Sequence, residues 1–187
     1  MGSASDNLPP IYTIGYGGRD IETFLKVLKE HDIEYLLDVR SWPKSNREDY
    51  SQEQLRRTLE KRGIRYAFFG DTLGGRPEDS DCYTNGHVDY DACRSKKWFR
   101  EGIERLRTAQ EKKYRVVVMC SEQRPEECHR IKMIGVGLEN SDIDVKHIDE
   151  SGDLRTQQEV LKRITKNQSS LFDDDPETGL HSRNSYD

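Results

Sequence analysis

The stretch Val116-Val117-Val118-Met119-Cys120-Ser121-Glu122 continues through Pro125 into Cys128-His129-Arg130. Its first half is an apolar run of β-branched residues, which is typical of a strand that is buried on both faces. A thiol, a carboxylate, a second thiol, an imidazole and a guanidinium follow directly, and Pro125 is well placed to open a helix. Open α/β sheets place ligand sites beyond the carboxyl ends of their strands. We therefore expect the chemistry of this chain to be concentrated here.

An alternation of strands and helices extends in both directions from this stretch. Helices are predicted at residues 21–28, from Ser51 onward, and at 98–110, 125–139 and 154–164; strands are predicted at 11–14, 34–39, 65–69, 114–119 and 144–148. Strands that alternate with helices favour a parallel sheet covered on both faces. The predicted fold class is α/β: a single three-layer domain with a mostly parallel sheet of about five strands and helices on both faces.

Length and composition set the expected domain limits. A chain of 187 residues suits one domain, and its 33% hydrophobic and 35% charged residues imply that some polar sequence lies outside the packed fold. We expect a flexible start at residues 1–10, the α/β domain at 11–165, and a disordered acidic tail at 166–187. Within the domain, residues 70–95 form a long polar insert, which is either a lid or recognition loop or a plain surface excursion.

Charge and hydropathy exclude several classes of protein. The net charge of -5 gives no general reason to bind nucleic acid, although a local basic face remains open. No apolar run is long enough to span a bilayer, and the start has no apolar signal region, so we expect a cytoplasmic protein without a membrane partner. The four cysteines are expected to be free thiols.

Two earlier strand ends carry candidate ligand-binding residues. Gly15, Tyr16 and Gly17 follow the first strand, where glycine lets a ligand approach the backbone and helix amides attract anions. The third glycine of the dinucleotide-binding fingerprint is missing, so a purely structural turn is the alternative.

Asp38, Arg40, Ser41 and Ser45 belong to the end of the second strand and its loop. Asp38 alternates with apolar residues, and a buried carboxylate needs a charged or hydrogen-bonding partner. An internal ion pair or a loop anchor is one interpretation. The other is an anion or substrate clamp built from Arg40, Ser41 and Ser45, with Arg47 as a further candidate.

Cys120 permits three interpretations. As a nucleophile, its thiolate would be stabilised by the following helix N-terminus and by Arg124 or Arg130. Tyrosine phosphatases and many rhodanese-like enzymes have an arginine six places after the cysteine, but Glu126 stands there, so that resemblance fails. The simplest interpretation makes Cys120 and Cys128 small buried residues within a hydrogen-bonded lining.

A metal site is the third interpretation, with Cys120, Cys128, His129 and the distant His147 as ligands. Seven residues separate the two cysteines, which is not the usual spacing of a zinc knuckle. Adjacent Cys128 and His129 on one helix would also point about 100° apart. We therefore predict no metal ligands. His147 ends the fifth strand and either faces the same crevice or belongs to the core.

Several ordered motifs together resemble the domain-of-unknown-function family 488, over about residues 11–153. They are Thr13-Ile14-Gly15-Tyr16-Gly17, Asp38-Val39-Arg40-Ser41, Leu73-Gly74-Gly75-Arg76-Pro77, Met119-Cys120-Ser121-Glu122, Cys128-His129-Arg130 and His147-Ile148. The resemblance implies an α/β fold and supplies no reaction. The family often has histidine and serine where this chain has Tyr16-Gly17, and arginine where it has Asn46, which implies a pocket of different polarity.

The leading hypothesis is an enzyme or binder for an anionic, nucleotide-like or nucleic-acid-like ligand at the carboxyl edge of the sheet. A hydrolase- or transferase-like reaction would use Cys120, Glu122 and Asp38. The remaining residues would bind the ligand: Gly15, Tyr16, Gly17, Arg40, Ser41, Ser45, Gly74, Gly75, Arg76, Cys128, His129, Arg130 and His147. The alternatives are a non-catalytic protein- or nucleic-acid-interaction module and a metal-binding protein. The sequence identifies no cofactor and no oligomeric state.

Overall fold

A six-stranded sheet forms the centre of the protein, whose structure, a computed structural model, describes residues 8–168 and 181–186. The strands follow the order β3 (Arg65–Phe68), β2 (Tyr35–Asp38), β6 (Val116–Cys120), β1 (Ile11–Gly15), β7 (Val145–Ile148) and β8 (Leu154–Thr156). Neighbouring strands are parallel except for β7 and β8, which are antiparallel. The prediction of an α/β domain with a mostly parallel sheet is confirmed. The additional strand, β8, occupies residues that were predicted to open the last helix.

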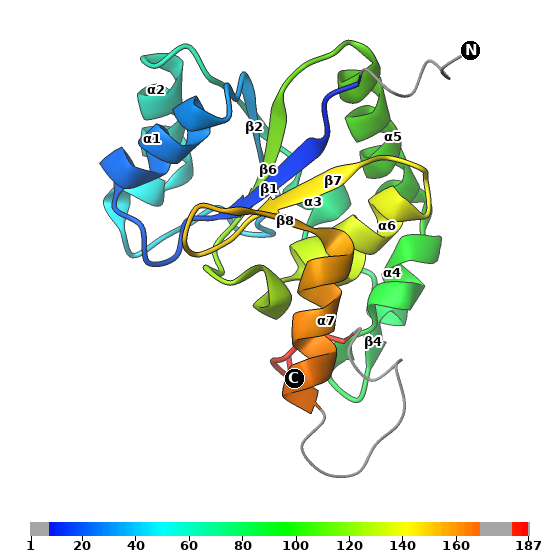
Figure 1. Cartoon of the computed structure of the whole chain (residues 1–187). Helices are drawn as coiled ribbons and strands as arrows, with labels where there is room; N and C mark the ends of the chain where they lie inside the picture. The colour runs from blue at the N-terminus through cyan, green and yellow to red at the C-terminus, as the bar shows by residue number, and fades with distance from the viewer. Residues whose placement is uncertain (1–7, 169–180, 187) are drawn as a thin grey trace, which may run out of the picture.

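Helices cover both faces of this sheet (Figure 1). On one face lie α1 (Ile21–Glu30) and α2 (Gln52–Glu60); on the other lie α4 (Tyr90–Ser95), α5 (Lys97–Glu111) and α6 (Val136–Glu139). The short α3 (Gly70–Leu73) packs against α5, and α7 (Gln157–Gln168) contacts the segment after β6. Three short 3-10 turns lie at Glu48–Tyr50, Ser80–Cys82 and Pro125–Glu127.

The strands are buried on both faces because consecutive side chains enter different cores. Leu36 packs with the residues of α1 and α2, whereas Leu37 packs with those of α4 and α5. Val117 and Val118 divide in the same way. This is the arrangement that the uninterrupted apolar run of β6 predicts, since every second side chain of a strand points to the same face.

The insert at residues 70–95 is folded rather than a plain loop. It contains α3, the 3-10 turn, α4 and a two-stranded antiparallel hairpin of β4 (Tyr83–Thr84) and β5 (His87–Val88). These elements are too short to show a hydrophobic period. The sequence pattern therefore predicted the place of the insert but not its internal structure.

The last described segment, His181–Tyr186, packs against this insert. His181 forms a β-bridge with Asp89, the Ser182 amide donates to the Val88 carbonyl at 3.1 Å, and the Tyr186 amide donates to the Gly86 carbonyl at 2.7 Å. A disordered tail was expected over residues 166–187, but two parts of it are ordered. The helix α7 continues to Gln168, and His181–Tyr186 packs against the insert. Residues 169–180 and 187 lie outside the described residues.

The segment after Pro125 is not one continuous helix. The 3-10 turn ends at Cys128, whose backbone is extended (φ -117°, ψ 148°), and a π-helix over Arg130–Gly135 precedes α6. The prediction of a helix over 125–139 is therefore wrong at its first turn. Because the chain changes direction at Cys128, this residue and His129 do not occupy successive positions of one regular helix.

Among the described residues, no helix combines the length and the apolar character needed to cross a membrane. Of the expected flexible start at 1–10, residues 1–7 lie outside the described part, and the Pro9 carbonyl accepts a hydrogen bond from Gln110 Nε2 at 3.0 Å.

Candidate functional site

A cavity of about 450 Å³ lies at the carboxyl edge of the sheet, where β1, β2 and β6 end. Its walls come from the loops after these strands, from the insert and from the last described segment. Half of the predicted site residues line it: Tyr16, Arg40, Ser41, Gly75, Arg76, Cys120, Glu122 and His129. The cavity therefore lies where the strand-end rule for α/β sheets predicts it.

Two thiols, a carboxyl and an imidazole meet on one side of this cavity. Cys120 Sγ lies 2.8 Å from Glu122 Oε2 and 3.6 Å from His129 Nδ1. Cys128 Sγ lies 3.3 Å from the same carboxyl oxygen and 3.6 Å from the same ring nitrogen. Cys128 is not among the lining residues, so it lies behind the other three. We call Cys120, Glu122, Cys128 and His129 the thiol cluster.

The orientation of the His129 ring is fixed from both sides. Its Nε2 lies 3.1 Å from the Leu73 carbonyl, so the ring presents Nδ1 to the two sulfurs. Gly75 packs directly on the ring, since a Cβ atom there would lie 2.7 Å from His129 Cγ. Position 75 therefore requires a glycine, because any side chain there would collide with the His129 ring. This explains the second glycine of the Leu73-Gly74-Gly75-Arg76 motif.

The thiol cluster shares its charge unequally. Burial opposes ionisation of Cys120, but hydrogen bonds and the neighbouring His129 outweigh it and hold the pKa of this thiol well below its usual value. Burial and the negative Cys120 raise the pKa of Cys128. They also raise the pKa of Glu122. Burial disfavours protonation of His129, yet the Cys120 charge raises its pKa overall. The cluster thus favours a Cys120 thiolate beside a His129 imidazolium.

Asp38 and Arg40 form a buried ion pair at the end of β2. Arg40 Nε and Nη2 donate to the two carboxylate oxygens of Asp38 at 2.8 Å and 2.6 Å, and Tyr66 Oη donates to the same carboxylate at 2.7 Å. Arg40 also donates to the Tyr50 carbonyl and lies over the Tyr16 ring. Arg40 reaches the cavity, whereas Asp38 is fully buried and does not line it.

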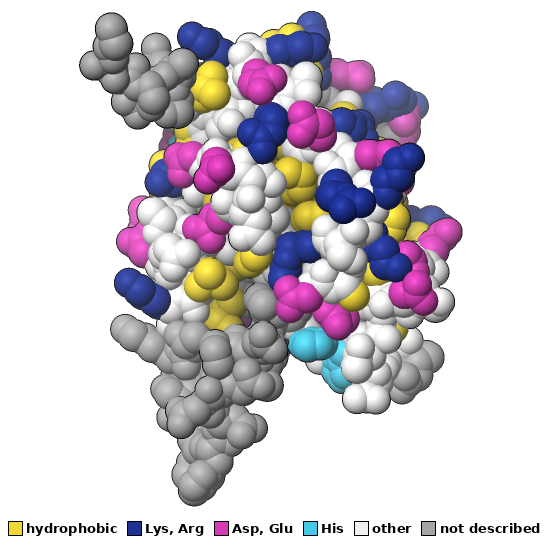
Figure 2. All heavy atoms as spheres, turned by 90° about the vertical axis from the view of Figure 1, so that its right-hand side faces the viewer, with side chains coloured by type: hydrophobic (Ala, Val, Ile, Leu, Met, Phe, Trp, Pro, Cys, Tyr) yellow, Lys and Arg dark blue, Asp and Glu magenta, His cyan; other side chains and the backbone are white. Residues whose placement is uncertain are grey.

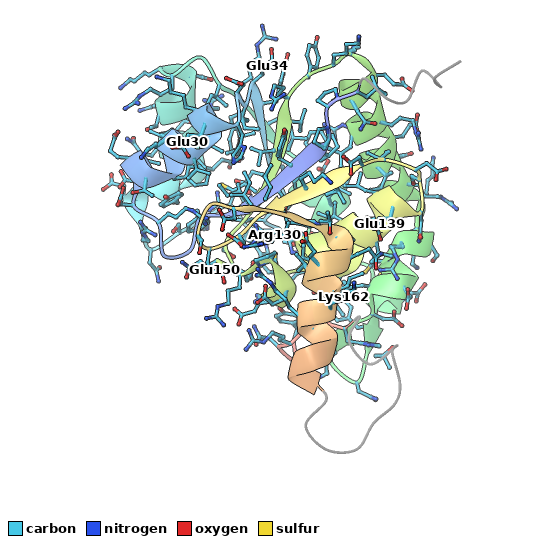
Figure 3. All side chains as sticks on the ribbon, viewed as in Figure 1. Glu30, Glu34, Arg130, Glu139, Glu150 and Lys162 are labelled. Atoms are coloured by element: carbon cyan, nitrogen blue, oxygen red, sulfur yellow. The ribbon has the colours of Figure 1, made fainter. Side chains whose placement is uncertain are left out.

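Arg130 lies inside the fold instead of on the cavity (Figure 3). Its side chain is fully buried, and Nη2 donates to the carbonyls of Glu122 at 3.1 Å and Gln123 at 3.0 Å. The other guanidinium nitrogens have no hydrogen-bond partner within the described residues. Arg130 therefore braces the loop that carries Glu122.

His147 also lies away from the cavity. Its ring nitrogens contact Thr13 Oγ1 and Gln157 Oε1, both at 2.8 Å, in the interior between β1, β7 and α7. Burial, with the nearby positive charge of Arg130, lowers the pKa of His147 to about 3. The structure thus matches the interpretation of His147 as a core residue.

The remaining predicted residues shape the loops around the cavity. A Cβ atom on Gly15 would overlap the Glu122 carbonyl, and the Gly17 amide donates to the Ser121 carbonyl at 3.0 Å. Gly74 packs against the Gly70 carbonyl and Ser41 Oγ. Ser45 Oγ accepts from Tyr16 Oη at 3.3 Å. None of Gly15, Gly17, Gly74 and Ser45 lines the cavity.

Several lining residues were missed by the sequence reasoning. Trp42, whose side chain is 62% exposed, and Lys44 belong to the loop that follows β2 and Arg40, so their position after a strand end was a usable signal. No sequence signal indicated the wall formed by the last described segment, because this segment was expected to belong to a disordered tail. The lining residues of this wall are Ser182, Arg183, Asn184 and Tyr186. Arg183 pairs with Glu127 at 3.1 Å.

Arg76, which lines the cavity, contacts two aromatic rings. Its guanidinium carbon is 4.0 Å from the ring centre of Tyr186 and 5.6 Å from that of Trp42. Its amide donates to Ser41 Oγ at 2.9 Å. The insert, the loop after β2 and the last described segment thus meet at one basic and aromatic surface.

A comparison with protein-family models places part of this chain in a family. A family model described as "Domain of unknown function DUF488" matches residues 20–134. No curated protein and no solved structure matches this chain.

Proposed function

Because this chain belongs to the DUF488 family, whose description assigns no reaction, we propose from its cavity that it binds a small anionic ligand of the nucleotide class. The observation that carries this proposal is the pairing of two basic side chains with the thiol cluster around one cavity. Lys44 and Arg76 line it and form no ion pair with any described residue. The resemblance to this family, which the sequence motifs indicated, is confirmed. The anionic ligand is our proposal.

The charge balance of the cavity favours an anion. Of its four basic side chains, Arg40 is neutralised by Asp38, and Arg183 is paired with Glu127. Lys44 and Arg76 remain to hold a negative group, and arginine presents several donors in a planar fork that suits phosphate or carboxylate. Arg76 is held in place by its contacts with Trp42 and Tyr186.

The aromatic side chains favour a ligand with a planar ring. Trp42 is exposed beside Lys44, and Tyr186 lies on the other side of Arg76. Stacking of a base on an aromatic side chain contributes about 1–3 kcal/mol.

A small ligand fits better than a long nucleic acid. Acidic and basic side chains are interspersed over the face of α4 and α5 shown in Figure 2, and the net charge is -5. This face does not offer the continuous basic surface that a nucleic-acid backbone requires, and the negative net charge gives no general attraction to one.

The thiol cluster supports a hydrolase- or transferase-like reaction on this ligand. Glu122 lies within hydrogen-bond distance of both thiols, which suits proton transfer during a reaction. Cys120 and Glu122 line the cavity together, so a ligand held by Lys44 and Arg76 would lie beside them. Asp38 contributes by fixing Arg40, since all its hydrogen bonds are made inside the protein.

Calorimetric titration with nucleoside mono- and diphosphates, and with inorganic phosphate, tests the proposal. K44A and R76A should each weaken binding by about tenfold, the equivalent of about 1.4 kcal/mol, with little change in melting temperature. K26A is the matched control, because Lys26 is 76% exposed on α1 and does not line the cavity.

Three outcomes decide between the hypotheses. Binding that K44A and R76A weaken, with turnover of the ligand, supports an enzyme. The same binding without turnover supports a non-catalytic binding module. If none of these anions binds, or if both variants bind like K26A, the anion site is refuted.

A further inference from the structure

We propose that Cys120, Cys128 and His129 bind one divalent transition-metal ion, with Zn²⁺ as the preferred ion, and that Glu122 stands beside its fourth coordination position. This inference goes beyond the anionic ligand and does not depend on it, since its residues differ from Lys44 and Arg76, which would bind the anion. The spacing of the two cysteines and a continuous helix at Cys128-His129 argued against such a site. In the folded chain the helix is not continuous there, and the three side chains meet.

The distances between the donor atoms match a tetrahedral ion. Both sulfurs lie 3.6 Å from His129 Nδ1, and all three donor atoms lie within 4.8 Å of one another. With Zn–S bonds of about 2.3 Å and Zn–N bonds of about 2.0–2.1 Å, a tetrahedron requires a sulfur-to-nitrogen distance of about 3.6 Å. Both observed distances have this value.

The backbone explains how two adjacent residues face one point. Cys128 has an extended conformation at the end of a 3-10 turn, whereas His129 has helical dihedral angles (φ -59°, ψ -21°). The angle of about 100° between neighbours on one helix therefore does not apply here. Cys120 approaches from the end of β6, which gives a third ligand from a rigid strand.

Hydrogen bonds from neighbouring backbone groups orient these ligands in the way that is usual for metal ligands. A histidine that binds a metal through one nitrogen commonly donates its other N–H to a carbonyl or carboxylate. His129 Nε2 lies 3.1 Å from the Leu73 carbonyl, which leaves Nδ1 free for the ion. The Arg130 amide donates to Cys128 Sγ at 3.5 Å, and such a bond stabilises a bound thiolate.

The position of Glu122 indicates an ion that is accessible from the cavity. Its Oε2 lies 2.8 Å and 3.3 Å from the two sulfurs but does not belong to the group of three ligand atoms, so the carboxylate stands beside the proposed ion, where it can hold a ligand at the fourth position. Cys120, Glu122 and His129 line the cavity while Cys128 is only 1% exposed. Three protein ligands with a fourth position facing a cavity are typical of catalytic zinc sites.

The second pair of thiols provides a natural contrast. Cys82 and Cys93 are also buried and free. Among the described residues, three or more metal-ligating side chains lie close enough together to hold one ion only at Cys120, Cys128 and His129. The second pair is therefore a suitable control for thiols that merely lie close together.

Metal analysis of the full chain, purified without an affinity tag and without added metal, is the first test. We expect about one Zn²⁺ per chain by mass spectrometry. After chelation, titration with Co²⁺ should produce the near-ultraviolet charge-transfer band of a cobalt–thiolate bond. A wild-type chain that takes up neither ion when titrated refutes the site.

Variants locate the ion. C128S and H129A should each weaken Zn²⁺ binding by at least about 100-fold, which is the upper end of the losses seen when outer-shell partners are removed. C93S is the matched control and should bind like the wild type. If C128S binds Zn²⁺ as tightly as C93S, the proposed ligands are wrong.

A measurement on the wild type covers the case in which a variant fails to fold. Stepwise reaction of the folded protein's thiols with an organomercurial should release all of the bound Zn²⁺ to a colorimetric chelator by the time the four thiols have reacted. Complete reaction of the thiols with the ion retained would also refute cysteine ligation.

The metal proposal and the anion proposal fail separately. R76A should retain the full Zn²⁺ content while its affinity for anions falls. Zn²⁺ binding without any nucleotide or phosphate binding would leave the metal site standing and refute the anion site. The opposite result would refute the metal site alone.

Discussion

Asp38 and Arg40 show how a residue pattern that indicates a catalytic group can serve a structural role. Both side chains are almost completely buried, and the carboxylate accepts from Arg40 and Tyr66. Removing one partner of a buried ion pair leaves the other charge uncompensated, which is more costly than the pair is stabilising. The guanidinium at the cavity wall therefore depends on a carboxylate that does not touch the cavity.

D38N should destabilise the fold by about 3–5 kcal/mol, because Arg40 would keep its charge without a counterion. Y66F removes only one hydrogen bond to the carboxylate and should cost about 1.5–3 kcal/mol. Urea unfolding of both variants measures the difference. A D38N protein of wild-type stability that has lost activity would instead identify Asp38 as an acid/base residue.

His147 makes stability depend on pH. Its pKa is about 3 in the folded protein against 6.5 for a free histidine, so the unfolded chain takes up a proton that the folded chain does not. Its contribution is complete above about pH 6.5 and is lost as the pH falls toward 3, by up to about 1.4 kcal/mol per pH unit.

H147N should remove this dependence. Urea unfolding of wild type and variant at several pH values between about 4 and 7 measures the two slopes, and the wild type should lose more stability than H147N on acidification. Parallel curves for the two proteins would show that His147 takes up its proton in the folded state.

At the scale of elements, the last described segment contributes more than its length suggests. The Val88 amide donates to Ser182 Oγ at 2.9 Å and the Val88 carbonyl accepts from the Ser182 amide, so His181–Tyr186 joins the hairpin of the insert. The same segment supplies Arg183, Asn184 and Tyr186 to the cavity. One wall of the cavity thus depends on contacts between parts of the chain that are far apart in sequence.

Removing residues 181–187 should open the cavity and expose the hairpin. Hydrogen exchange at the Val88 amide should become faster, since its acceptor is lost. The affinity for anions should fall because Tyr186 no longer packs on Arg76. S182A is the milder companion and should speed exchange without removing Tyr186. An unchanged exchange rate at Val88 in the shortened chain would contradict the docking of this segment.

The sequence predicted the elements whose patterns are long and strong. The β-branched run of β6 and the helical period of α1 were located to within a few residues, because each buries a regular face. The two-residue strands of the hairpin have too few residues for any period. The π-helix after His129 and the strand β8 depend on packing against α7 and β7, which no local pattern records.

For the candidate site, the sequence predicted which types of residue are present more easily than which way their side chains point. The strand-end rule brought Cys120, Glu122 and Arg40 to one cavity, as expected. It could not place Arg130 and His147, because their orientation follows from the turn at Cys128 and from the partners Thr13 and Gln157. The positions of the Cys128 and His129 side chains likewise depend on the end of the 3-10 turn at Cys128. The prediction of one continuous helix from Pro125 did not include this end.

At the scale of the whole molecule, one sheet separates two cores, and the loops at one of its edges line the cavity. The core beneath α1 and α2 contacts the same strands as the core beneath α4 and α5. The loops after β1, β2 and β6 leave this shared sheet at the cavity. The cavity floor is therefore held from both sides, whereas its outer wall comes from the insert and from His181–Tyr186.

This outer wall affects how the protein should be handled in the laboratory. The family match ends at residue 134, and a fragment cut there would lack both β7 and the segment that carries Tyr186. A tag fused close to Tyr186 would lie next to a residue that lines the cavity, and a polyhistidine tag would add competing metal ligands there. Binding studies should use the full chain with its carboxyl end untagged.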